Sequence, residues 1–213
     1  MAAAARLGGV RGLVVVPVVV AVAGCGSLDA HQLPPPAAPA RSPALRAVPA
    51  GQVLAGRLPA HDRWRARLPH GRVAVLDTRA RVLELRAADG RVLATAGAGV
   101  GPAAVAADPD GRRVYVTDTA GGALLVFSLA PRFALVHRVY LPGAPYAVAA
   151  ARGRLWVTLT ARNELAELNL RRRPQLLCRL PTLRQPDAVA ADAAGVTVAG
   201  AGRLQRIALT PRR

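Results

Sequence analysis

The chain has 213 residues, of which 29 are basic and 12 acidic, and its formal net charge is +17. Residues 12–24 carry no charge, but this apolar run is too short for a membrane-spanning helix, which needs about 20 residues. Every basic residue is Arg, a bias typical of GC-rich genomes. The high charge therefore predicts either association with an anionic surface or no more than a basic, solvated surface.

The N-terminus has the pattern of a secretory signal peptide. Arg6 and Arg11 form a positively charged region, and the apolar run 12–24 follows them directly. The run ends in Val22-Ala23-Gly24-Cys25, which resembles the lipobox of bacterial lipoproteins. This resemblance implies that residues 1–24 are removed and that Cys25 becomes an acylated (palmitate-type) first residue.

A lipid anchor would hold the protein at the extracytoplasmic face of the cell membrane, because two or more acyl chains give stable anchoring. Two alternatives remain open: cleavage at another site, with Cys25 incidental, or a signal anchor that is not cleaved. Export would leave no nucleic acid as a partner. The available polyanions would be phospholipid headgroups and acidic cell-wall polymers.

Residues 25–50 are rich in Pro and Ala, a composition typical of an extended linker without a core. We expect this segment to space the folded domain from the membrane. The sequence thus divides into a signal peptide (1–24), an anchored linker (25–50) and one domain (51–213). No cofactor is implied.

From residue 51 onward, short apolar runs alternate with Gly, Pro, Asp and Arg, which indicates strands and turns. Four segments recur at a spacing of 41 residues, and each is preceded and followed by further strand-like runs. This period, with four strands in each unit, is typical of a β-propeller. The recurring segments are GRVAVLD (71–77), RRVYVTD (112–118), GRLWVTL (153–159) and AGVTVAG (194–200).

One unit, PAAVAADPDGRRVYVTD (102–118), resembles the YVTN family of β-propeller repeats. The match lies in Asp108-Pro109-Asp110-Gly111 and in Tyr115-Val116-Thr117-Asp118, where Asp118 stands in place of the family's Asn. The resemblance implies an all-β propeller and says little about function.

The last unit lacks a fourth strand, and a spare strand, GQVLAGRLP (51–59), precedes the first unit. We expect residues 51–59 to complete the last blade and close a ring of about four blades, which would remove an exposed strand edge. The alternative is a homodimer in which two chains combine into a larger ring.

In propellers, ligands usually bind at the end where two sets of loops gather. One set connects successive blades, and the other connects the second and third strands within each blade. Several polar side chains fall in these loops, and Arg would suit a carboxylate or phosphate ligand. Each of them is equally explained as a solvated turn residue. The candidate ligand face consists of His61, Asp62, Arg79, Arg81, Tyr146, Arg162, Asn163, Arg184 and Asp187.

No catalytic motif and no metal-binding spacing of His or Cys is present in the sequence. We therefore expect a binding or scaffolding module, with another envelope protein or an acidic polymer as its partner. The alternative is a ligand sensor, or a degenerate hydrolase or lyase, that uses the mouth of the channel.

Overall fold

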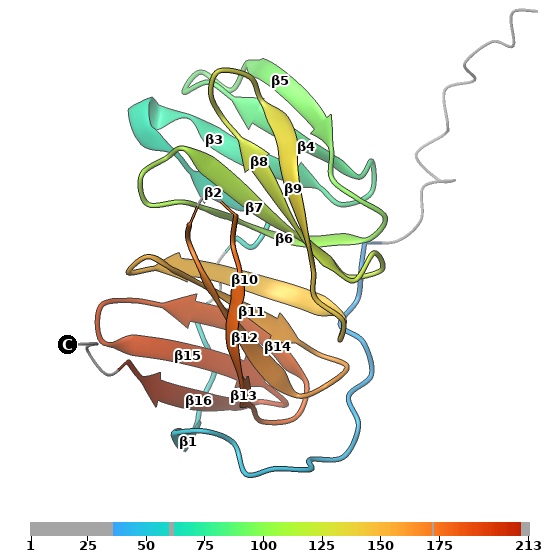
Figure 1. The fold of residues 1–213 in the computed structure, drawn as a ribbon, viewed down its shortest axis with the longest axis vertical. Coiled ribbons are helices and arrows are strands. Elements are labelled where there is room, and N and C mark those ends of the chain that lie inside the picture. Colours follow the sequence, from blue (N-terminus) through green and yellow to red (C-terminus); the bar gives the residue numbers. More distant parts are fainter. Residues whose placement is uncertain (1–35, 60–61, 172, 210–213) are drawn as a thin grey trace, which may run out of the picture. The chain divides into compact units, whose positions relative to one another are not determined.

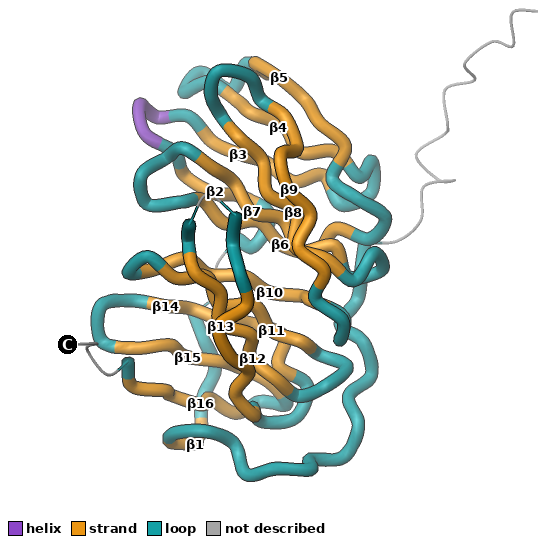
Figure 2. Tube along the Cα trace, in the orientation of Figure 1, coloured by secondary structure: helices purple, strands orange, loops and turns teal. Residues whose placement is uncertain are grey.

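The computed structural model describes residues 36–59, 62–171 and 173–209. These residues form strands β1 to β16, arranged in four antiparallel sheets of four strands (Figure 1, Figure 2). The first sheet contains β2 (Arg65–Arg67), β3 (Val73–Asp77), β4 (Val82–Arg86) and β5 (Val92–Gly97). The second contains β6 (Pro102–Ala107), β7 (Arg113–Asp118), β8 (Ala123–Ser128) and β9 (Ala134–Tyr140).

The third sheet contains β10 (Pro145–Ala151), β11 (Arg154–Leu159), β12 (Glu164–Asn169) and β13 (Leu176–Pro181). The fourth contains β14 (Pro186–Ala191), β15 (Gly195–Gly200) and β16 (Arg203–Ala208), and β1 (Gln52–Ala55) completes it. Between β2 and β3 lies a short 3-10 turn, η2 (Pro69–Gly71). The predicted four-bladed propeller is confirmed, since each 41-residue repeat supplies the second strand of one sheet.

Strand β1 pairs antiparallel with β16, from Gln52 opposite Arg206 to Ala55 opposite Arg203. This confirms that an N-terminal strand supplies the missing fourth strand, although the strand is shorter than the segment 51–59. Gly51 marks its start with a positive φ of 73°, which a residue without Cβ adopts easily. The combination of two chains into a larger ring stays a hypothesis.

The core lies between successive sheets. The inner strands make these contacts, with β2 and β3 against β6, β6 and β7 against β10, and β10 and β11 against β14. Strand β7 shows how the sequence achieves this, because neighbouring side chains of a strand point to opposite faces. Val114 and Val116 pack towards the first sheet, whereas Tyr115 packs towards the third. Central strands therefore have nearly continuous apolar sequences.

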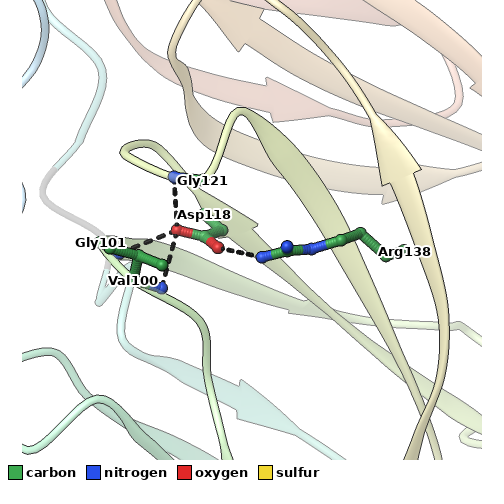
Figure 3. Close-up of polar contacts among 5 residues, drawn as sticks. All are labelled: Val100, Gly101, Asp118, Gly121 and Arg138. Atoms are coloured by element: carbon green, nitrogen blue, oxygen red, sulfur yellow. Dashed lines mark hydrogen bonds and ion pairs between the residues drawn. The ribbon is translucent and has the colours of Figure 1, made fainter.

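Asp118 organises two loops beside the second sheet (Figure 3). Its Oδ1 accepts hydrogen bonds from the backbone N–H groups of Val100, Gly101 and Gly121, at 3.1, 2.8 and 3.0 Å. Its Oδ2 pairs with Arg138 on β9. A Cβ at Gly121 would collide with this carboxylate, so the close approach requires glycine.

Residues 36–50 contain no strand, yet they are not a spacer separate from the propeller. Ser42 is 4% exposed, and its Oγ donates a 2.6 Å hydrogen bond to the carbonyl of Thr160. Near the start of β1, the N–H of Ala50 donates to the carbonyl of Pro181. Part of the expected linker is thus bonded to the third and fourth sheets.

Within the described residues, no helix is long and apolar enough to span the bilayer. The signal peptide and the lipobox residues Val22, Ala23, Gly24 and Cys25 lie outside the described residues. Their assignment stays a prediction from the sequence.

Candidate functional site

The turns between second and third strands meet the connections between sheets at one end of the propeller, here called the loop end. Backbone hydrogen bonds join the two kinds of loop in the first three sheets. Ala98 donates to the carbonyl of Arg81, Thr119 to that of Gly101, and Thr182 to that of Asn163. The loops that carry the candidate ligand face therefore lie at one end of the propeller, and the role of that face in ligand binding stays a prediction.

Two cavities lie along the inner strands. The loop-end cavity, of about 370 Å³, is formed by the segment after β1, the start of β14 and the β15–β16 turn. The inner-strand cavity, of about 630 Å³, is formed along β2, β6 and β10. Arg63 and Ala147 line both of them. Charged residues of the loop-end cavity are Arg57, Arg63, Asp187 and Arg203, and those of the inner-strand cavity are Asp62, Arg63, Arg65 and Arg67.

Arg63 is held in place by two aromatic rings. Its Cζ lies 5.0 Å from the ring centroid of Trp64 and 4.9 Å from that of Tyr146. Such cation–π contacts fix the guanidinium plane while its N–H groups remain able to bind an anion. Among the described residues, no carboxylate lies within ion-pair distance of Arg63, so its charge is not neutralised by direct contact.

Tyr146 is buried behind Arg63, with 2% of its surface exposed. Burial raises the pKa of its hydroxyl, and the neighbouring Arg63 opposes that rise. The neutral phenol therefore serves as a wall for the guanidinium rather than as a charged group. Trp64 is different, because 41% of its surface is exposed beside the same guanidinium.

Asp187 is the one acidic residue that lines the loop-end cavity, within the described part of the chain. Burial raises the pKa of its carboxyl, and both its own backbone N–H and the charge of Arg63 act in the opposite direction. Three arginines thus surround one carboxylate that is partly removed from water. An anion in this cavity would gain from the arginines and be opposed by Asp187.

Three of the predicted ligand-face residues come together around Arg63. Asp62 lines the inner-strand cavity, where its Oδ1 accepts from the N–H of Trp64 and its Oδ2 lies 3.4 Å from Arg65. Tyr146 and Asp187 reach the same arginine from β10 and β14. The sequence reasoning missed Arg63 itself, although a basic residue beside Trp64 directly after His61-Asp62 was a usable signal.

The other predicted residues that the structure describes lie away from these two cavities. Arg79 and Arg81 belong to the β3–β4 turn, which Asp77 organises by accepting from the N–H of Arg79. Arg184 is exposed in the β13–β14 connection. His61 lies outside the described residues.

Arg162 and Asn163 take part in a different contact. They line a cleft with Pro43 and residues 45–47 of the N-terminal segment, and Asn163 Nδ2 donates to the carbonyl of Pro43. The described residues contain no group of three His, Cys, Asp or Glu side chains that could hold a metal ion. The charged side chains of the two cavities favour electrostatic recognition of an anion.

No protein-family model matches the chain, and no curated protein is significantly similar in sequence. Solved structures match its fold. Virginiamycin B lyase from Staphylococcus aureus aligns with a TM-score of 0.57 at 13% identity, over 73% of this chain and 55% of that chain. The dihydro-heme d1 dehydrogenase NirN aligns with a TM-score of 0.57 at 18% identity, over 84% and 47%.

A β-propeller domain from Myceliophteria thermophila, Cps50 (Swd1), aligns with a TM-score of 0.54 at 14% identity, over 66% of this chain and 50% of that chain. The chain spans about half the length of each of these structures. At such low identities the similarity establishes the propeller fold alone.

Proposed function

We propose that the chain is an exported, lipid-anchored propeller that binds an anionic group around Arg63, and that it serves as a binding or scaffolding module at the cell envelope. The observation that carries this proposal is the position of Arg63, which lines both cavities and is held against Trp64 and Tyr146. A guanidinium fixed in this way loses little conformational freedom when it binds an anion.

The charge around Arg63 supports the same proposal. Across the two cavities the basic side chains outnumber the acidic ones, so a ligand with several negative charges gains more than a neutral one. Arg binds carboxylate and phosphate groups with paired hydrogen bonds. Acidic cell-wall polymers present such groups outside the cell membrane. The lining arginines are Arg57, Arg63, Arg65, Arg67 and Arg203.

The anion site is tested by calorimetric titration of the processed chain with inorganic phosphate and with poly(glycerol phosphate). Arg63→Ala should weaken binding at least tenfold, and Arg112→Ala should leave it unchanged. Arg112 is an exposed arginine that lines neither cavity, so this control removes the same charge elsewhere. Equal effects of the two variants would show that binding follows net charge and would reject the site.

The lipid anchor is supported by the lipobox resemblance of residues 22–25 and by the basic and apolar regions that precede it. Mass spectrometry of the chain purified from its native membrane tests it directly. We expect an acylated N-terminal Cys25, and a Cys25→Ala chain should carry no acyl group. An unmodified Cys25 in the wild type would refute the anchor.

A second candidate function, a hydrolase or lyase, is favoured by one observation. Asp187 has a raised pKa in a cavity, beside an arginine and a tyrosine, and such carboxyls are candidates for general acid–base work. Turnover of a bound ester or lactone that is lost in Asp187→Asn would support catalysis. Binding without turnover in the wild type would support the module.

A further inference from the structure

The N-terminal segment is bonded to the loop end by a compact set of hydrogen bonds. We call residues 40–43 the strap. The N–H of Ala40 donates to Thr160 Oγ1, and Gln185 Nε2 donates to the carbonyl of Ala40. Ser42 donates through its N–H to Gln185 Oε1 and through its Oγ to the carbonyl of Thr160. The strap is therefore held on both sides, by the β11–β12 turn and by the β13–β14 connection.

The residue that holds the strap, Gln185, belongs to the same β13–β14 connection that leads to the loop-end cavity. Gln185, which holds the strap, is two residues before Asp187, which lines the cavity. The backbone N–H of Gln185 donates to both Ser42 Oγ and Asn163 Oδ1. The end of the propeller that carries the cavity is thus the end to which the N-terminal segment is fixed.

Because the N-terminal segment is held on the propeller, only a short length of chain separates the propeller from an anchor at Cys25. Ala37 already packs against the core shared by the third and fourth sheets. Twelve residue steps separate Cys25 from Ala37, and even a fully extended chain of that length spans only about 40 Å. If residues 37–43 were all released, the next bonded residue would be Ala50, whose N–H donates to the carbonyl of Pro181, and the limit would rise to about 85 Å.

We propose that the strap holds the loop-end cavity towards the membrane in which Cys25 is anchored, and that this cavity takes the phosphate headgroup of an anionic phospholipid. The inference rests on the lipid anchor and on the anion site proposed above. A short tether raises the effective concentration of headgroups at the cavity far above that of free anions. The negative surface potential of such a membrane attracts Arg57, Arg63 and Arg203 in the same direction.

Trp64 provides a direct measurement of this orientation. It is exposed beside Arg63, whereas the other tryptophan, Trp156, is 1% exposed in the core. The lipidated chain is reconstituted in vesicles of phosphatidylglycerol and phosphatidylcholine that contain a headgroup-labelled quencher. We expect at least twofold quenching of the tryptophan emission, and Trp64→Phe should abolish that quenching.

Releasing the strap should reduce the quenching while the anchor remains. Ser42→Asp places an unpaired charge at a buried position and should displace the strap. Ala44→Asp adds the same charge at an exposed position and serves as the matched control. Ser42→Ala is the milder variant if Ser42→Asp unfolds the chain, and it should show an intermediate effect. Equal quenching in the wild type and in both Ser42 variants would overturn the role of the strap.

Two further measurements distinguish a failure of this inference from a failure of the proposed function. Acylation of Cys25 and titration with inorganic phosphate are measured on the same preparation. An acylated, phosphate-binding chain whose Trp64 is not quenched would overturn the orientation and leave the proposed function intact. Equal quenching on pure phosphatidylcholine vesicles would overturn the assignment to an anionic headgroup. Strong quenching that needs phosphatidylglycerol and resists millimolar free phosphate would support it.

Discussion

Asp118 Oδ2 lies 2.7 Å from Arg138 Nη2, and this ion pair ties an inner strand of the second sheet to its outermost strand. The two partners differ sharply in environment, since the Asp118 side chain is fully buried while half of the Arg138 side chain is exposed. The other carboxylate oxygen accepts three backbone N–H groups from two loops. One side chain therefore fixes both loops at the loop end of this sheet.

We predict that Asp118→Ala lowers the free energy of unfolding by about 3–5 kcal/mol, because it leaves three N–H groups and a guanidinium without their acceptor. The control is Asp77→Ala. Asp77 occupies the equivalent repeat position, but it is exposed, and its Oδ1 accepts from the N–H groups of Arg79 and Ala80. Asp77→Ala should lower the free energy of unfolding by about 1 kcal/mol, as measured by urea denaturation. Equal losses would show that burial of Asp118 adds nothing.

The comparison of Asp77 with Asp118 also shows what the sequence could predict. Both residues follow the second strand of a repeat, so the 41-residue period alone predicts their shared place in a turn. The partners of Asp118 could not be predicted, because Val100 and Gly101 lie 17–18 residues earlier and reach it only through the pairing of strands. The 41-residue period and the alternation of apolar runs with turn residues predict the blades. Contacts between loops depend instead on how the sheets assemble.

In the candidate site, too, the sequence predicts the position of some residues but not the contacts between sheets. Asp62, Tyr146 and Asp187 were predicted because the repeat places them in loops of the same end. Arg63 was missed because its role arises from Tyr146, which is 83 residues away in the sequence and in another sheet. The strap was missed for a related reason. Its Pro- and Ala-rich composition predicts an extended chain, but composition does not show that Gln185 and Thr160 offer it hydrogen bonds.

We predict that strand β1 protects the edge of β16. N–H groups of neighbouring residues in an edge strand point to opposite sides, so replacing Val53 and Leu54 together by proline removes the one donor of the two that faces β16. The lost hydrogen bond should lower stability by about 1 kcal/mol, and the uncovered edge should promote association.

The measurement is light scattering on a sizing column, together with thermal unfolding. Ala47→Pro and Val48→Pro together are the control, since both residues are exposed and lie outside β1. A monomeric, fully stable Val53→Pro, Leu54→Pro chain would contradict the protective role of β1.

We predict that Arg63→Lys binds sulfate about tenfold more weakly than the wild type, a difference of about 1.4 kcal/mol. Lysine keeps the charge but lacks the planar guanidinium that stacks on Trp64 and Tyr146 and that donates paired hydrogen bonds. Calorimetric titration measures the affinity. Arg112→Lys is the control at an exposed position outside both cavities. Unchanged affinity in Arg63→Lys would mean that charge alone recruits the anion.

The last prediction concerns pH and Asp187. Burial raises the pKa of its carboxyl above the ordinary value, so the group becomes neutral at a higher pH than an exposed aspartate. As the pH falls through this raised pKa, the loop-end cavity loses its negative charge while Arg57, Arg63 and Arg203 stay positive. Sulfate is the suitable probe, because it keeps its charge across this range. Its affinity should rise as the pH falls.

Asp187→Asn should remove most of this pH dependence and bind sulfate more tightly at pH 7. Stability should follow the same sign. Because the folded-state pKa is raised, the ionised carboxylate destabilises the fold above that pKa, and the penalty disappears as the pH falls below the unfolded-state value. Asp187→Asn should therefore be more stable than the wild type at pH 7 and no more stable under acid conditions. A wild-type sulfate affinity that is independent of pH would show that Asp187 does not face the bound anion.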